Sequence, residues 1–294
     1  MSDDRVEWAP LTSADLPAIV ALAGRCLAAD GGLPHSAEGS FVARRFVAPG
    51  GRALGGVAGG ELVAAGGVVV QTVDGRQRAT ISALVDPAWR GRGHGTHLLD
   101  WCLATGRELS GRVVVESESL TEAAAELLAG RGLRQVFAED ILRFDLAGTP
   151  LPEASLPDDV RLAEWTSELA ERFFATYQAS FRDRPGFPGW TALRWIDWIQ
   201  SDDEFRPQWS LLATTADEGD LAFIVSAQDW VVQVGVRPDR RGRGLGAALV
   251  VEALRRMREA GAAQALLDVN VNNPAGALYR RLGFVDIGRR ARYE

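Results

Sequence analysis

The sequence is 294 residues long, with 47% hydrophobic and 24% charged residues, which is typical of a globular protein long enough for two ordinary domains. A formal net charge of −7 argues against a nucleic-acid-binding protein and mildly favours cationic partners such as amines. Two cysteines are too few for a disulfide framework, and no apolar stretch is long enough to span a membrane.

The first half is predicted to mix helices with strands. Its start, "MSDDRVEW", is acidic and polar, unlike a signal peptide, so we expect a cytoplasmic protein with no membrane partner. A Thr-Ser pair marks the beginning of a helix over 12–30. Strands rich in Val, Ala and Gly are predicted at 61–73 and 81–85, and a helix at 96–109 follows a loop of glycine and arginine. A strand at 112–117, another helix and a final strand complete this half.

A proline-rich segment at 146–159 separates the two halves. Pro150, Pro152 and Pro157 lack backbone donors and favour extended chain, which is typical of a linker. The sequence therefore predicts a first domain over 1–147 and a second over 158–294.

The second half repeats the order of the first. Its predicted elements are a strand at 160–165, a helix at 166–181, strands at 209–215, 221–228 and 230–236, a helix at 247–261, a strand at 265–271, a late helix and a final strand. Strands and helices mixed in this way indicate an α/β or α+β sheet.

The two halves also repeat in their residues. The string "DPAWRGRGHGTHLL" at 86–99 returns as "RPDRRGRGLGAALV" at 237–250, an offset of 151 positions. The same offset places Val85 on Val236 and Gly132 on Gly283. A constant offset over about fifty residues indicates a tandem duplication of one kind of domain.

The repeated loop follows a strand and precedes a helix, an arrangement that favours phosphate binding because the first N–H groups of a helix lack partners within it. A tight glycine turn with solvated arginines is one alternative. A dinucleotide site is another, since Gly242, Gly244 and Ala247 satisfy G-x-G-x-x-A, but the first copy has Thr96 at the last position. The loop also lies far from the opening strand that this fingerprint follows. A third interpretation is a nucleotide-containing thioester held by its pyrophosphate.

The motif R-x-x-G-x-G between a strand and a helix resembles the coenzyme A loop of the GCN5-related N-acetyltransferases (GNAT family). "NNPAGALYRRLGF" at 272–284 resembles the late helix of that family. The resemblance covers both halves. It implies two tandem GNAT domains, each with a mixed, mostly antiparallel central sheet flanked by helices, and acetyl-CoA as the acyl donor.

The resemblance also implies roles for particular residues. The backbone of Val234 and Val236 pairs with the pantetheine arm, and an N–H of this strand polarises the thioester carbonyl. Asn272 contacts the arm, and Tyr279 protonates the leaving thiolate. The implied cofactor-binding residues are Val234, Gly235, Val236, Arg241, Gly242, Arg243, Gly244, Leu245, Gly246, Ala247 and Asn272 in the second half, and Leu84, Val85, Arg90, Gly91, Arg92, Gly93, His94, Gly95 and Thr96 in the first.

A tyrosine pKa near 10 and a thiol pKa near 8.5 are close enough for the proposed acid to share its proton. No base is assigned, because Gln233 stands where the family often has Glu, and Asp229 and Asp268 are equally open candidates. In the first half Leu128 matches Tyr279 and Thr121 matches Asn272. We therefore expect the second half to be catalytic, and the first either to bind coenzyme A without turnover or to serve only as structure.

The sequence thus predicts transfer of an acetyl group from acetyl-CoA to a primary amine of a small molecule, with no metal, by a monomer or a homodimer. One alternative is a longer acyl group. Another is acetylation of a cysteinyl pseudodisaccharide, because "ASFRDRPGFPGWT" at 179–191 is weakly similar to mycothiol synthase, a tandem member of the family. A non-catalytic acyl-CoA-binding module is a further alternative. The aromatic segment 180–198 is expected to shape the acceptor pocket, although its aromatic residues also suit a helix core.

Overall fold

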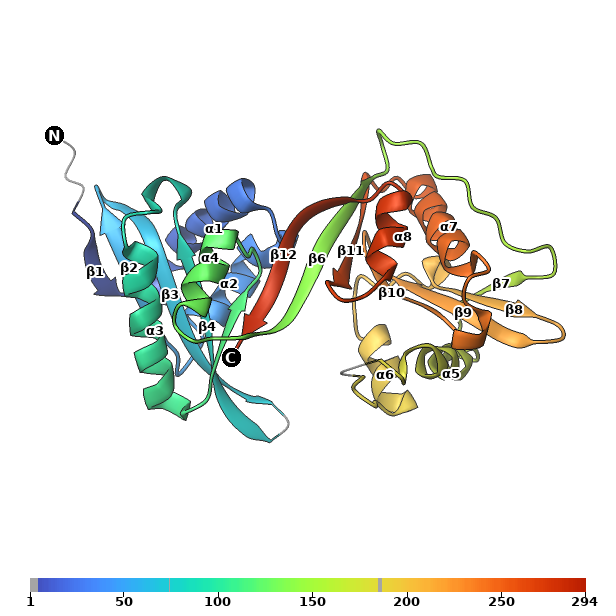
Figure 1. The fold of residues 1–294 in the computed structure, drawn as a ribbon, viewed down its shortest axis with the longest axis horizontal. Helices are drawn as coiled ribbons and strands as arrows, with labels where there is room; N and C mark the ends of the chain where they lie inside the picture. Colours follow the sequence, from blue (N-terminus) through green and yellow to red (C-terminus); the bar gives the residue numbers. More distant parts are fainter. Residues whose placement is uncertain (1–4, 74, 185–186) are drawn as a thin grey trace. The chain divides into compact units, whose positions relative to one another are not determined.

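The computed structural model describes residues 5–73, 75–184 and 187–294, and the chain forms two compact units (Figure 1). Unit 1 consists of Met1–Ile141 together with Ile287–Glu294, and unit 2 consists of Leu142–Asp286. These limits differ from the expected domains 1–147 and 158–294, because the last strand of the chain joins the sheet of unit 1.

Unit 1 begins with a short strand and a helical hairpin and continues into the central strands. Its elements are β1 (Glu7–Pro10), α1 (Leu16–Asp30), α2 (Gly39–Phe46), β2 (Arg52–Ala58), β3 (Glu61–Val73), β4 (Arg76–Val85), α3 (His94–Ser110), β5 (Val113–Ser117), α4 (Glu122–Ala129), β6 (Gln135–Asp145) and the end of β12 (Val285–Tyr293), with short 3₁₀ turns at Ser13–Asp15, Pro34–Ala37 and Pro87–Trp89.

The sheet of unit 1 is mixed and mostly antiparallel, as expected. Its strand order is β1-β2-β3-β4-β5-β12-β6. Neighbouring strands are antiparallel from β1 to β4 and again between β5 and β12. Strands β4 and β5 run parallel, and they pair over no more than Ala79–Ile81 and Val113–Val115. The last residues of β4 therefore extend beyond this pairing.

Helices cover both faces of this sheet (Figure 1). Gly66 and Gly67 in β3 point to opposite faces, as successive strand residues do. A Cβ on Gly66 would lie 2.7 Å from the Cys102 sulfur in α3, whereas a Cβ on Gly67 would lie 2.7 Å from the Cα of Phe46 in α2. Glycine at both positions lets α3 approach one face and α2 the other.

The C-terminal strand β12 completes the sheet of unit 1. Ala291, Arg292 and Tyr293 pair with Ser117, Glu116 and Val115 of β5. Arg134 and Glu294 exchange two backbone hydrogen bonds of 2.7 and 2.9 Å, which join the start of β6 to the chain end. The sequence repeat placed this strand with the second half, because a repeat identifies equivalent strands but not their partners.

Unit 2 repeats the order of elements. They are β7 (Arg161–Glu164), α5 (Ala170–Phe181), α6 (Ala192–Gln200), β8 (Leu211–Thr215), β9 (Gly219–Ser226), β10 (Val231–Val236), α7 (Leu245–Glu259), β11 (Gln264–Asn270) and α8 (Ala275–Arg281), with 3₁₀ turns at Pro207–Trp209 and Pro238–Arg240. None of the helices in the described residues is both long and apolar enough to cross a membrane.

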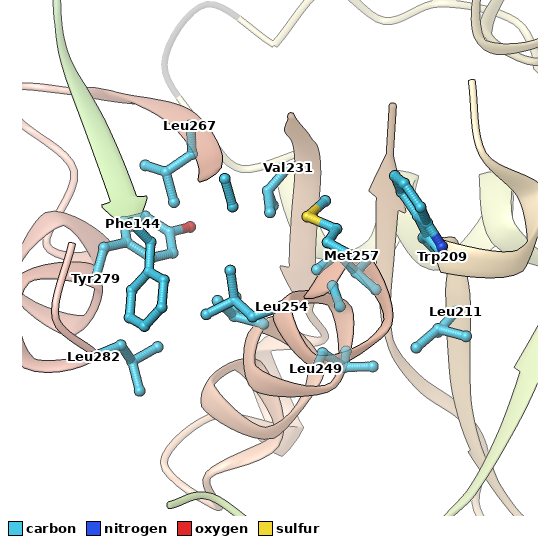
Figure 2. Packing of buried hydrophobic residues seen from close by; sticks show 14 of the residues in the cluster. Phe144, Trp209, Leu211, Val231, Leu249, Leu254, Met257, Leu267, Tyr279 and Leu282 are labelled. Carbon is cyan, nitrogen blue, oxygen red and sulfur yellow. The ribbon is translucent and has the colours of Figure 1, made fainter. Parts of the chain in front are cut away.

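Two apolar cores lie on the two faces of the antiparallel sheet β10-β9-β8-β7. Successive residues of β9 alternate between them: Ala222 and Ile224 pack with α7, whereas Phe223 and Val225 pack with α5 and α6. Figure 2 shows the α7 side, where Leu249, Leu254 and Met257 meet the strands and the α8 residue Tyr279. The sheet therefore holds its helices from both sides.

The proline-rich segment 146–159 is part of unit 2 rather than a free linker. Leu151 and Leu156 pack against the core on the α7 side, and the Leu146 N–H donates to the Ala263 carbonyl at 2.9 Å. Its leucines therefore attach this segment to the core.

Candidate functional site

The glycine loop of unit 2 joins β10 to α7. Gly242 and Gly244 have φ of 77° and 80°, a backbone conformation that favours glycine, and Gly244 caps the start of α7. A Cβ on either glycine would meet no atom within 4 Å, so the space outside the loop is open. The Ala248 N–H donates to the Gly244 carbonyl at 3.0 Å, which leaves the N–H groups of Leu245, Gly246 and Ala247 without helix partners. This start of α7 fits an anionic group.

Unit 1 builds the same loop between β4 and α3. Gly91 and Gly93 have φ of 74° and 85°, and Gly93 caps α3. The His97 N–H donates to the Gly93 carbonyl at 3.1 Å, so the amides of His94, Gly95 and Thr96 lack helix partners. The duplication predicted from the sequence is thus a duplication of backbone geometry.

One arginine ties each loop to its strand. Arg241 Nε donates to the Val236 carbonyl at 3.3 Å, and Arg90 Nε donates to the Val85 carbonyl at 3.1 Å. The second bond of Arg241 goes to the Ser180 carbonyl at 2.9 Å. Both guanidinium groups are therefore engaged by the protein, and the backbone amides are the groups that each loop presents outward.

The two loops differ in the partners of this arginine. Arg90 forms two hydrogen bonds of 2.6 Å with Asp30, and these bonds raise the pKa of the Arg90 guanidinium. Arg241 has no carboxylate partner among the described residues. Arg243 lies 3.6 Å from Glu218, and Arg92 lies over the Trp89 ring. Arg90 therefore has a carboxylate partner, whereas its counterpart Arg241 bonds to backbone carbonyls.

Strand β10 has one open edge. On one side it pairs with β9, and the Arg237 N–H donates to the Leu221 carbonyl at 3.0 Å. Because hydrogen bonds alternate along an antiparallel pair, Val234 and Val236 direct their backbone groups away from β9. On that side the described pairing with β11 is the isolated bridge Trp230–Leu266, which lies just before β10. Beyond this bridge, in the described part of the chain, the backbone groups of Val234 and Val236 at this edge have no strand partner.

Two residues assigned to cofactor binding have their backbones engaged elsewhere. By the same alternation Gly235 directs its N–H to β9, and Leu84 directs its N–H to β3. A Cβ on Gly235 would lie 2.6 Å from Phe223 and 2.9 Å from the Cβ of Ser180. Gly235 thus allows α5 to pack closely on β10.

Tyr279 lies in the core on the α7 side and is 7% exposed. Figure 2 shows its hydroxyl directed towards the side where Leu267 and Val231 lie. Within the described residues this hydroxyl makes no hydrogen bond. Burial raises the pKa of Tyr279 to about 12, while the charge of Arg184 lowers it and that of Asp268 raises it. The hydroxyl is therefore a persistent donor, but a weaker acid than the ordinary tyrosine assumed from the sequence.

The position equivalent to Tyr279 in unit 1 is a buried apolar residue. Leu128 is 5% exposed and lies in the last turn of α4. Thr121, the match of Asn272, caps α4 by accepting the Ala124 N–H at 3.2 Å. In unit 2 the comparable bond, from the Ala275 N–H at 3.0 Å, goes to Asn273 rather than to the exposed Asn272. Asn272 is thus left without a capping role.

The candidate bases and Gln233 lie in different surroundings. Gln233 Oε1 accepts the Trp195 indole N–H at 3.1 Å, so its amide oxygen is engaged and the side chain supplies no basic group. Asp229 precedes the Trp230–Leu266 bridge and accepts from Gln264 at 3.1 Å. Asp268 follows the bridge on β11, and its charge acts on Tyr279. Of the two aspartates, Asp268 is therefore the one beyond the bridge.

The aromatic segment 180–198 is partly core and partly surface, and Pro185 and Gly186 lie outside the described residues. Trp195 is fully buried and stacks on Tyr177 with ring centroids 4.9 Å apart. Trp198 is 42% exposed and meets Trp190 edge-on at 5.4 Å. The charge of Arg184 lowers the pKa of both Tyr177 and Tyr279. Arg184 was not predicted from the sequence, because it belongs to no motif.

In unit 1 the backbone of the chain closes off the end of β5. The Leu33 N–H donates to the Glu118 carbonyl at 2.9 Å, and the Gly32 N–H donates to the Ile287 carbonyl at 2.8 Å. A Cβ on Gly31 would lie 1.8 Å from that same carbonyl. This tight backbone contact therefore covers the end of β5.

Both cysteines are buried free thiols. Burial raises the pKa of Cys102 to about 12, and burial also raises the pKa of Cys26, whose thiol donates to the Val85 carbonyl at 3.4 Å. Because the thiolate is the reactive form, we expect neither cysteine of the native protein to react with iodoacetamide at pH 8, and both to react in urea. Mass spectrometry of the alkylated peptides measures this. Equal labelling before and after unfolding would contradict the burial.

Among the described residues, no group of three or more His, Cys, Asp or Glu side chains could hold a metal ion. The arrangement in unit 2 is instead an open strand edge, a helix start with unsatisfied amides and a buried tyrosine. Together these groups can hold an extended chain that ends in a phosphate-like anion.

Comparison with known proteins matches the acetyltransferase (GNAT) family twice, at residues 22–133 and 162–284. A mycothiol acetyltransferase of Thermobispora bispora is 34% identical over 288 residues, which cover 93% of each chain. A GCN5-related N-acetyltransferase from Sphaerobacter thermophilus has a TM-score of 0.74 at 28% identity, covering 100% of this chain and 96% of that one. A tandem GNAT protein from the clavulanic acid biosynthesis pathway shares the fold, with a TM-score of 0.61 at 18% identity over 98% of both chains.

The family match falls once on each repeat, and its two segments contain the two glycine loops. The full-length relative and the shared tandem fold agree with this division. The chain therefore belongs to the acetyltransferase (GNAT) family, as a tandem member and an acyltransferase.

Proposed function

We propose that the protein transfers an acetyl group from acetyl-CoA to the primary amine of a small molecule, with unit 2 as the catalytic centre. The observation that carries this proposal is the open edge of β10 beside the glycine-capped start of α7. Acetyl-CoA would supply the acetyl group as a thioester and a pyrophosphate as the anchor. The amides of Leu245, Gly246 and Ala247 suit the anchor. An outward N–H of β10 suits the thioester oxygen, where it stabilises developing negative charge.

Tyr279 serves in this proposal as the donor to the departing thiolate. A pKa of about 12 keeps its hydroxyl protonated at neutral pH. The ordinary thiol pKa near 8.5 lies well below that value, so complete transfer of the tyrosine proton is unfavourable. We infer that Tyr279 stabilises the thiolate mainly by a hydrogen bond that strengthens as charge develops, which still lowers the barrier.

Asp268 is the group we propose to receive the amine proton, directly or through one water. Asp268→Asn keeps the size of the side chain and removes its basicity, so we expect turnover to fall by about 10²-fold with donor affinity unchanged. Asp229→Asn is the matched control, because Asp229 lies before the bridge. Steady-state kinetics on both variants provide the measurement. Equal losses in the two variants would remove Asp268 from this role.

Unit 1 is proposed to bind coenzyme A without turnover. Its glycine loop has the same geometry, but Leu128 replaces the tyrosine, and Gly31–Leu33 closes the end of β5. We expect calorimetric titration to approach two coenzyme A molecules per chain, with weaker binding in unit 1 because Asp30 neutralises Arg90. A firm stoichiometry of one, abolished by Gly244→Glu alone, would show that the first loop does not bind.

The full-length similarity to mycothiol acetyltransferases favours one acceptor in particular. We therefore propose, as a second and narrower candidate, acetylation of the cysteinyl amine of a pseudodisaccharide. The exposed ring of Trp198, which meets Trp190 edge-on, offers apolar surface that suits the ring of a sugar-like acceptor. This reaction would take place in the cytoplasm and needs no more than a monomer or a homodimer.

Release of free thiol from acetyl-CoA in the presence of an amine panel tests both candidates. The panel contains a cysteinyl pseudodisaccharide, simple amino sugars, amino acids and polyamines. Turnover with the pseudodisaccharide alone supports acetylation of that acceptor. Turnover with another amine supports only the general proposal of a small-molecule amine. A longer acyl donor used faster than acetyl-CoA would change the donor assignment, and no turnover with any amine would refute the proposal.

A further inference from the structure

A second polar site lies in unit 1, apart from the glycine loops. A pocket of about 270 Å³ is lined by Arg44, Arg45, Arg78 and Arg292, together with Gln71 and Glu116. These residues come from α2, β3, β4, β5 and the end of β12, and all of them belong to unit 1. Four arginines around one small pocket concentrate positive charge in a protein that is acidic overall.

The carboxylates at this pocket do not neutralise its arginines. Glu116 is 4% exposed at its side chain and pairs with Arg45, with Arg78 at 3.0 Å and with Arg292 at 3.4 Å. Arg45 also pairs with Glu118 at 2.8 Å. Four arginines thus meet two carboxylates, a surplus of two positive charges.

The pocket is also rich in hydrogen-bond donors and poor in acceptors. Thr80 donates its hydroxyl to Gln71 Oε1 at 3.2 Å, so the amide of Gln71 presents NH₂ to its surroundings. Arg78 Nε is buried and has no hydrogen-bond partner. Arg44 forms no ion pair with any described residue. A buried donor without an acceptor is costly and is normally satisfied by water or a ligand.

Aromatic rings lie against three of the guanidinium groups of this pocket. Arg44 and Arg45 lie over the Phe41 ring, 5.7 and 5.1 Å from its centre. Arg292 lies 4.9 Å from the centre of the Phe137 ring. These contacts orient planar groups that match carboxylate and phosphate oxygens. The donors are therefore arranged before any ligand arrives.

The pocket is separate from the coenzyme A loop of unit 1. Gln71 shares the face of β3 with Gly67, which packs against α2, whereas the loop leads into α3 on the opposite face. Along β4, Arg78 and Val85 are seven residues apart, roughly 23 Å at the usual rise of a strand. An anion in this pocket is not the pyrophosphate of a donor bound at Gly91–Thr96.

We propose that this pocket binds a small dianion, either a phosphate or a molecule with two carboxylates. Two negative charges match the surplus of two positive charges. The volume lies just below the range of about 300–1,000 Å³ typical of drug-sized ligands, which suits a small metabolite. The proposal concerns unit 1 alone and does not depend on which amine unit 2 acetylates.

Calorimetry on the full chain tests the proposal, with coenzyme A present at saturation so that both glycine loops are occupied. The probes are inorganic phosphate and succinate, with acetate as the singly charged comparison. We expect saturable binding of one dianion per chain, at least tenfold tighter than acetate. Competition between phosphate and succinate would place both in one site, and binding of only one would identify the preferred chemistry.

Three variants locate the binding. Arg44→Gln and Arg292→Gln should each weaken the dianion at least tenfold, because each removes a charged donor from an exposed side of the pocket. Glu116→Gln should strengthen it by removing a negative charge. Arg52→Gln is the matched control, since Arg52 is an arginine of unit 1 paired with Glu108 outside this pocket.

Retained coenzyme A affinity and circular dichroism show that each variant is folded, and if Glu116→Gln fails this check the two arginine variants still decide. A purely structural ion-pair network predicts no saturable binding of any probe at millimolar concentration. Either that result, or equal affinity in wild type, Arg44→Gln and Arg292→Gln, would overturn the proposal.

Discussion

Gly244→Glu should abolish coenzyme A binding by unit 2 while the fold survives. The new carboxylate would stand at the start of α7, in the space where a Cβ meets no atom within 4 Å. At about 4 Å, two like charges repel by about 4 kcal/mol at an effective dielectric constant of 20, which corresponds to about a 10³-fold loss of affinity. Calorimetric titration of coenzyme A, with thermal unfolding measured alongside, provides the test.

Two controls separate charge from backbone strain in this experiment. Gly244 has φ of 80°, so any L-residue there costs roughly 1–2 kcal/mol. Gly244→Ala carries the same strain without the carboxylate and should lose far less affinity. Gly93→Glu makes the equivalent change in unit 1, where φ is 85°, and should remove only the weaker binding event. Unchanged affinity in Gly244→Glu would mean that the loop does not contact the pyrophosphate.

The glycine loops were predictable from the sequence because local chemistry determines them. Glycine at 91, 93, 242 and 244 is required by positive φ, and the helices begin directly after Gly93 and Gly244. The repeat then identified the equivalent strands, since two copies of one fold carry residues in equivalent places. The mixed sheet with helices on both faces and the family membership are accordingly confirmed.

Long-range pairing was not predictable in the same way. The final strand, β12, pairs with β5 of unit 1, and nothing in "VDIGRRARY" identifies that partner. The difference between the two loops has the same origin, because Asp30 and Arg90 are sixty positions apart. The arginine pocket likewise gathers side chains from distant elements. Such contacts depend on the folded sheet, and a pattern along the chain does not contain them.

The pKa of Tyr279 was also not predictable from the sequence. A sequence position suggests an ordinary pKa near 10, whereas burial in the core raises the pKa to about 12. The higher value changes the expected role from full proton donor to hydrogen-bond donor. It also predicts that ionisation of Tyr279 does not limit turnover anywhere below about pH 10.

Tyr279→Phe should lower turnover by about 10²–10⁴, the range for a positioned donor. The change removes one hydroxyl and little volume from a side chain that is 7% exposed, so folding and donor affinity should be nearly unaffected. Rapid kinetics with the true acceptor, together with coenzyme A titration, separate the effect on chemistry from that on binding.

Leu128→Ala is the matched change in unit 1. Leu128 is 5% exposed and carries no hydroxyl, so its truncation should cost about 2–5 kcal/mol of stability and little turnover. Opposite effects on rate and stability in the two variants would place catalysis at Tyr279 and packing at Leu128. If Tyr279→Phe instead keeps most of the wild-type rate, the thiolate leaves without help from this hydroxyl. If Gly93→Glu then stops turnover and Gly244→Glu does not, the reaction takes place in unit 1.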